Sequence, residues 1–247
     1  ERVFLDENDL TPEPRLEAHD FFPLQETVLG RSTAELIDRH GIDAQPFDRR
    51  AVRLFRRMER GSARVAVTSL ALAGDSGMSS STYFVNIDGD SRANLMRSER
   101  VYRNAIANHR MIRAVPRATV CDDAYCMALN LGLDNRRLLP PFMPVHRGSD
   151  DIFGALLKAS AEGSCFGFLP WTPAHEPAAR QRPAIPDRAV RLSVEGIVHM
   201  IVRTFAPVEA KGPEGNLVDL GKMLSDLGRA RTNTFEEALR ILAWQNA

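Results

Sequence analysis

The run from residue 64 to residue 73 most constrains the fold, because it is rich in Val, Leu and Ala and closes on the turn Gly74-Asp75-Ser76-Gly77. A short apolar run bounded by a turn is typical of a buried strand. Further strands are predicted at residues 82–87 and 165–169. The apolar run Val3-Phe4-Leu5 predicts another strand at the opening of the chain.

Helical patterns alternate with these runs. Ser32 and Glu35 form a capping box that predicts a helix start, and Gly41 follows as a stop. Residues 48–60 predict a second helix. Residues 91–113 predict one long helix that Pro116 would end, and a further helix is predicted to open at Asp150.

The pattern becomes helical throughout after a linker rich in Pro, Ala and Arg at residues 172–187. A helical stripe runs from Val190 to Phe205, and two more helices are predicted beyond Gly215, the last opening on a capping box at Thr234. We therefore expect an α/β part over residues 1–177 and a helical C-terminal region over residues 178–247.

Charge and composition exclude several functions. Lys and Arg number 32, Asp and Glu number 32, and the formal net charge is zero. This balance removes the electrostatic argument for a nucleic-acid binder or a polybasic membrane surface. No apolar run reaches the roughly 18 residues of a membrane span. Three cysteines without a CxxC pair favour a reducing compartment. We expect a cytoplasmic protein, with a peripheral position at the inner membrane face left open.

An acidic cluster follows the opening strand. Asp6, Asn8 and Asp9 lie just past Leu5. Oxygen ligands at a strand end suit Mg²⁺ or Mn²⁺, which bridge carboxylates to phosphates. A solvated turn explains the same residues, because Asp and Asn are common in turns.

A second candidate is Asp150, at the predicted helix start in Ser149-Asp150-Asp151-Ile152. Free backbone N–H groups and the helix dipole stabilise a carboxylate there, and it could accept a proton from a hydroxyl. Simple N-capping explains the residue equally well.

Two further candidates are cationic or titratable. His175 lies in a Pro-stiffened loop and could contact a metal ion or a diphosphate, although most lone histidines do neither. Arg136 and Arg137 could clamp a phosphate, or equally pair with surface acids.

The order of these motifs resembles a GT-A glycosyltransferase, broadly of family 2. The segment from Asp122 to Pro177 looks like the acceptor-side half of such enzymes, with an acidic helix start followed by a late His. The resemblance implies a GT-A-like mixed sheet flanked by helices. It also implies that the nucleotide-binding portion normally preceding the acidic cluster is missing before Glu1.

The resemblance assigns roles to the candidate residues. Asp6, Asn8 and Asp9 match the DxD-like position that binds a divalent cation, Mg²⁺ or Mn²⁺, and the nucleotide-sugar diphosphate. Asp150 matches the carboxylate that deprotonates the acceptor hydroxyl. The expected metal ligands are Asp6, Asp9 and His175, and Arg136 is expected at the nucleotide-sugar. The expected partners are a nucleotide-sugar and an acceptor.

Two other functions stay open. A non-catalytic interaction or scaffold domain would leave these residues scattered over the surface. The turn at Ser76 also resembles the nucleophile turn of GDSL esterases, in which a Ser after the first strand attacks an ester. The esterase hypothesis requires Ser76 within hydrogen-bond reach of a His.

Overall fold

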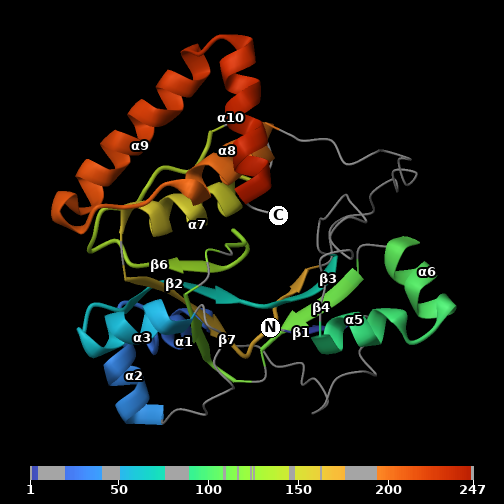
Figure 1. Cartoon of the computed structure of the whole chain (residues 1–247). Coiled ribbons are helices and arrows are strands. Elements are labelled where there is room, and N and C mark those ends of the chain that lie inside the picture. The colour runs from blue at the N-terminus through green and yellow to red at the C-terminus, as the bar shows by residue number, and fades with distance from the viewer. Residues whose placement is uncertain are drawn as a thin grey trace. The chain divides into compact units, whose positions relative to one another are not determined.

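We describe the protein from a computed structural model of the whole chain (Figure 1). The described residues are 2–4, 20–40, 51–75, 89–107, 110–115, 117–122, 124, 126–144, 148–161, 163–175 and 194–245. The chain divides into two compact units built from interleaved segments. Unit 1 contains Glu1–Thr27, Ser69–Thr119 and Phe168–Arg191, and unit 2 contains Val28–Thr68, Val120–Gly167 and Leu192–Ala247.

Unit 1 holds a mixed four-stranded sheet in the order β1-β4-β3-β8. Its strands are β1 (Arg2–Phe4), β3 (Leu72–Asp75), β4 (Arg110–Ala114) and β8 (Ala174–His175). β4 pairs antiparallel with both β1 and β3, whereas β3 pairs parallel with β8. The strand expected at the opening of the chain is thus confirmed as β1.

The helices of unit 1 correct one expectation. The single helix predicted over residues 91–113 is wrong, because the chain forms α5 (Gly89–Met96), α6 (Glu99–Ala107) and then β4. Ser98 causes the break, since its Oγ accepts a hydrogen bond from Val101 N at 3.3 Å and caps α6 as a new helix. The remaining helix described in unit 1 is α1 (Phe21–Glu26).

The second sheet has the order β5-β7-β2-β6, and its strands lie mainly in unit 2. They are β5 (Thr119–Cys121), β2 (Arg64–Leu70), β6 (Leu131–Leu133) and β7 (Ser164–Leu169). The predicted strand at residues 64–73 divides into β2 and β3 at Ala71, whose N–H bonds Trp171 O at 2.9 Å. The strand predicted at residues 165–169 is confirmed as β7.

Two short helices of unit 2 precede β2. α2 (Thr33–His40) starts at the predicted capping box, where Glu35 N donates to Ser32 Oγ at 3.1 Å. α3 (Ala51–Glu59) occupies the segment predicted as the second helix.

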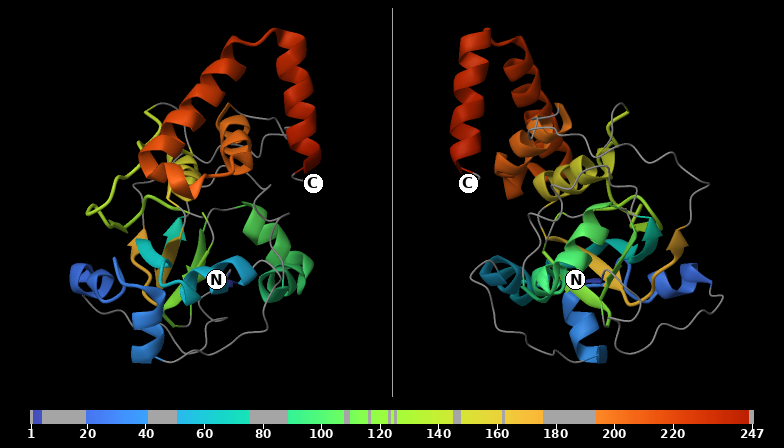
Figure 2. Two further views of the ribbon diagram at one scale, coloured as in Figure 1. Left: turned by 60° about the vertical axis from the view of Figure 1, so that its left-hand side comes forward. Right: turned by 90° about the vertical axis from the view of Figure 1, so that its right-hand side faces the viewer.

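The centre of unit 2 is α7 (Ser149–Ser160), which contacts α8 and α9. Figures 1 and 2 show α7 between these helices and the strands β2 and β6. Phe153 and Leu157 of α7, Val65 of β2 and Phe166 of β7 are all buried to 2% exposure or less. Burying each such side chain contributes about 1.5–3 kcal/mol.

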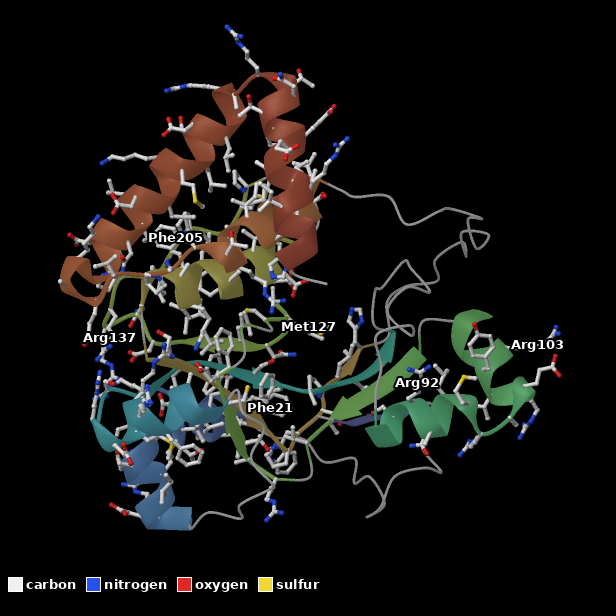
Figure 3. The ribbon with its side chains drawn as sticks, in the orientation of Figure 1. Phe21, Arg92, Arg103, Met127, Arg137 and Phe205 are labelled. Carbon is white, nitrogen blue, oxygen red and sulfur yellow. The ribbon has the colours of Figure 1, made fainter. Side chains whose placement is uncertain are left out.

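Of the C-terminal helices, α8 and α9 pack on α7, and α10 packs on α8. They are α8 (Val194–Thr204), α9 (Gly212–Arg229) and α10 (Thr232–Gln245), with a 3-10 turn at Glu209–Lys211 before α9. Figure 2 shows α9 and α10 as a helical hairpin. Phe205, labelled in Figure 3, packs against the buried cluster formed by Ala155, Ala159, Val202 and Leu220.

A buried polar side chain ties α9 to α7. Asn216, 2% exposed, donates from Nδ2 to Ser160 O at 3.2 Å and accepts from Val208 N at 2.9 Å. Both polar ends of the amide are therefore satisfied, as burial requires.

The mixed α/β class with a C-terminal helical region is confirmed. The boundary near residue 177 stays a prediction. In the described structure α8 and α9 pack on α7 within one unit.

Gly154 allows a close backbone approach at the centre of α7. A Cβ there would lie 2.0 Å from the carbonyl oxygen of Ala124 and 3.1 Å from the Cβ of Cys126. Ala124 and Cys126 can therefore lie directly against the helix.

We expect Gly154→Ala to lower the free energy of unfolding by about 1–3 kcal/mol, because the added methyl forces a backbone shift. Gly221→Ala in α9 is the matched control, since a Cβ there meets nothing within 4 Å. The control should raise stability by roughly 0.5–1 kcal/mol through helix propensity alone. Urea unfolding followed by circular dichroism measures both changes, and equal effects would contradict the close approach.

Candidate functional site

The structure places the predicted site residues in different parts of the chain. Asp6, Asn8 and Asp9 lie outside the described residues. His175 lies in β8 of unit 1, in register with Gly74 of β3, and its side chain is partly exposed. Asp150 and Arg136 both belong to unit 2. The predicted convergence of the acids and His175 on one cation stays a prediction.

Asp150 is the second residue of α7, whose N-cap is Gly148. Its Oδ2 accepts a hydrogen bond from Ala128 N at 3.0 Å, and its Oδ1 accepts one from Asp151 N at 3.1 Å. Both oxygens are therefore held by backbone N–H groups, one from the helix start and one from the loop that faces it. The helix dipole stabilises a negative charge at this position.

An aromatic stack fixes the start of the same helix. The rings of Phe142 and Phe153 lie 4.1 Å apart and are tilted by 4°. Phe142 follows Pro140 and Pro141, whose rings restrict the backbone. The stack therefore holds a stiff segment against α7 one turn beyond Asp150.

Cys126 lies in the loop that Asp150 anchors, and it is 1% exposed. Burial raises the pKa of its thiol to about 12, and the negative charges of Asp150 and Asp151 act in the same direction. The thiol is therefore neutral and unreactive at physiological pH.

Arg136 is positioned by a buried carboxylate. Its Nε donates to Asp134 Oδ1 at 2.6 Å, and its Nη2 donates to Asp134 Oδ2 at 3.0 Å. The Asp134 side chain is 5% exposed, whereas the Arg136 side chain is 65% exposed. The side-chain hydrogen bonds from Arg136 hold the pKa of Asp134 below its usual value, against the opposing effect of burial.

Arg64 and Arg136 donate to the same backbone carbonyl oxygen. The carbonyl oxygen of Gly30 accepts from Arg136 Nη2 at 3.2 Å and also from Arg64 Nη1. The strand β2 positions both partners, because Gly30 N bonds Val65 O at 2.8 Å and Asp134 N bonds Ala66 O at 3.0 Å. Arg136 and Gly30 are 106 residues apart in sequence. The sequence indicated Arg136 and Arg137 but held no signal for Arg64.

An ion network that the sequence did not indicate lies elsewhere in unit 2. Asp122 accepts from Arg57 Nη1 at 3.3 Å and from Lys158 Nζ, and Lys158 also donates to Ser164 O at 2.8 Å. The three charged side chains are 17–20% exposed. This network ties α3, α7 and β7 together, and we assign it a structural role.

The described residues leave little enclosed space for a ligand beside Asp134. A cavity of about 10 Å³, lined by Arg64, Asp134, Arg137 and Ser164 among others, has room for about one water molecule. No three His, Cys, Asp or Glu side chains in this part of the chain are grouped so that they could hold a metal ion. Asp6 and Asp9 lie outside the described residues.

None of the described helices is both long enough and apolar enough to span a membrane. Comparison with known proteins finds no family model, no curated protein and no solved structure that matches this chain.

We expect Asp150→Asn to lower the pKa of the Cys126 thiol, because a nearby carboxylate destabilises the thiolate. At pH 8.5, a thiol with a pKa of about 12 is ionised in only about one molecule in 3,000. Alkylation of Cys126 by iodoacetamide should therefore be slow in the native protein and faster in the variant. Mass spectrometry of the Cys126 peptide measures the rate.

Cys165 is the internal control for this experiment. Its thiol pKa is raised by burial, and the charges that act on it belong to Lys158, Asp122 and Arg57. Its alkylation rate should not change in Asp150→Asn. An unchanged rate at Cys126 would contradict the proximity of the two groups.

Arg136→Gln should make the protein less stable at neutral pH, and the difference from wild type should shrink in acid. The depressed pKa of Asp134 means that its stabilising contribution is present above the unfolded-state value near 3.9 and is lost as pH falls through the folded-state value. Urea midpoints at pH 7 and pH 2 measure the difference. Arg137→Gln is the control and should show a smaller change, because Arg137 acts on Asp134 only through its charge.

Proposed function

We propose that this chain is a glycosyltransferase that moves a sugar from a nucleotide-sugar donor to an acceptor hydroxyl, with Asp150 as the base. The observation that supports the proposal is the geometry of Asp150. Its two carboxylate oxygens are each held by one backbone N–H at the start of a buried helix. A carboxylate oxygen has further lone pairs, so each can still accept a proton or a hydroxyl hydrogen bond.

The proposed reaction is a single proton transfer coupled to sugar transfer. As the acceptor oxygen bonds to the anomeric carbon, the hydroxyl proton passes to Asp150 and the bond to the nucleoside diphosphate breaks. A base held by rigid backbone groups needs no rearrangement at this step. The packing of Phe142 on Phe153 supplies that rigidity one turn along α7.

The leaving group is a diphosphate, and cations stabilise its developing charge. Arg136 is the described residue that we assign to this contact, because its guanidinium is oriented by Asp134 and largely exposed. The Mg²⁺ or Mn²⁺ site expected at Asp6, Asp9 and His175 stays a prediction, because Asp6 and Asp9 lie outside the described residues. A divalent cation would add charge neutralisation when bound. A cytoplasmic location stays part of the proposal.

A non-catalytic interaction domain is the second candidate, and one observation favours it. Each oxygen of Asp150 already has a backbone partner, so the residue could serve only to anchor the Ala128 loop on α7. The esterase hypothesis stays a prediction, because Ser76 lies outside the described residues.

The test is release of nucleoside diphosphate from a panel of nucleotide-sugars with Mn²⁺ and sugar acceptors. We expect one donor to be consumed, and Asp150→Asn to lower kcat by at least about 100-fold, as loss of a general base does. Asp226→Asn on the exposed face of α9 is the matched control and should keep the wild-type rate.

Two results would contradict the proposal. Either no donor in the panel is consumed, or Asp150→Asn keeps the full rate while only its stability falls. The second result would establish the anchoring role instead.

A further inference from the structure

Two arginine side chains of unit 2 converge on one backbone oxygen. Arg64 Nη1 and Arg136 Nη2 both donate to the carbonyl of Gly30. Nitrogens that share one acceptor are at most about 6 Å apart. Two positive charges held this close repel each other, and the Asp134 carboxylate paired with Arg136 offsets only one of them.

We infer that Arg64, Arg136 and Arg137 form a binding site for a diphosphate group. This inference deepens the proposed function and rests on it, because the diphosphate of a nucleotide-sugar is the ligand that the site would take.

The charges around the site are unbalanced. Arg64, Arg137 and Asp134 line the same small cavity, and Asp134 also pairs with Arg136. Among the described residues, this places three guanidinium groups and one carboxylate at the site. The neighbouring Arg31 does not alter this count, since it pairs with Glu35 at 2.6 Å. A bound dianion would neutralise the excess.

The cationic groups remain accessible to a ligand. Asp134 engages Nε and Nη2 of Arg136, and Gly30 also engages Nη2, so none of these bonds uses Nη1. The Arg136 side chain is 65% exposed. Arg137 is exposed as well, and Figure 3 shows its side chain at the edge of the ribbon.

Gly30 makes room for this arrangement. Its φ is +72°, and a Cβ at this residue would lie 1.6 Å from Arg136 Nη2. A side chain at position 30 would displace the Arg136 guanidinium from the Gly30 carbonyl, so the observed position of Arg136 depends on this glycine.

The guanidinium donors suit phosphate oxygens as ligands. Guanidinium groups bind phosphate through paired N–H donors, and several arginines together suit the adjacent phosphoryl groups of a diphosphate. The cavity of about 10 Å³ is too small for a base or a sugar ring. The ligand would therefore lie across the surface with only its phosphates held by this site.

The experiment is calorimetric titration of the full chain with inorganic pyrophosphate, at low salt and without metal. We expect wild type to bind, Arg136→Gln and Arg137→Gln each to weaken binding at least tenfold, and added salt to weaken it further. Arg103→Gln on α6 is the matched control, because Arg103 is exposed and pairs with Glu99 of the same helix. It should bind as wild type does.

Inorganic phosphate and a nucleoside diphosphate serve as comparison ligands. The nucleoside diphosphate should bind as tightly as pyrophosphate, and phosphate more weakly. Arg137→Gln keeps every Asp134 bond described above, so it tests the site even if Arg136→Gln unfolds. Equal pyrophosphate affinity in wild type, Arg137→Gln and the control would overturn the inference.

The outcomes separate this site from the proposed function. Arginine-dependent pyrophosphate binding without consumption of any nucleotide-sugar would leave the site standing and reject the glycosyltransferase. Consumption of a nucleotide-sugar with an unchanged KM in Arg137→Gln would reject the site and leave the glycosyltransferase standing.

Discussion

Burial of α7 is the constraint on which unit 2 depends. Most of its twelve residues are buried, and Phe153 and Leu157 are among the most deeply buried side chains of the described structure. α8 and α9 cover the helix, and Lys158 ties it to β7 through Ser164 O. The absence of a side chain at Gly154 lets the Ala124 backbone approach the helix. The position of Asp150 follows, because its backbone belongs to this helix and backbone N–H groups hold both of its carboxylate oxygens.

Two carboxylates of unit 2, Asp122 and Asp134, form ion pairs that differ in the exposure of their cations. Around Asp122, two cations and one carboxylate are all largely buried, so the network links elements and offers little to solvent. Breaking a buried pair is strongly destabilising, because it leaves an uncompensated charge. Around Asp134 the carboxylate is buried and its arginine is exposed, so the same type of bond orients a cation toward solvent. Because of this difference in exposure, we propose a ligand-binding role for the Asp134–Arg136 pair and a structural role for the Asp122 network.

Sequence signals within one helical turn predicted where two helices start. The capping box at Ser32 begins α2, and the acidic residues at Asp150 begin α7, because both depend on side chains within one turn. The helix predicted over residues 91–113 failed for a related reason. Its apolar spacing is helical throughout, but Ser98 starts a second helix, and residues 110–114 pair with β1 and β3. Sheet partners are distant in sequence, so helical periodicity could not exclude a strand.

The sequence by itself determined the α/β class, the strand predicted at residues 165–169, most of the strand predicted at residues 64–73, and the helix start at Asp150. Only the tertiary structure decided what surrounds them. It brought the guanidinium groups of Arg64 and Arg136 to the carbonyl oxygen of Gly30. This follows because the segments that carry Gly30 and Arg136 both bond to β2. Capping and periodicity act within a few residues of the chain, whereas the field at a guanidinium depends on every group that folding places beside it.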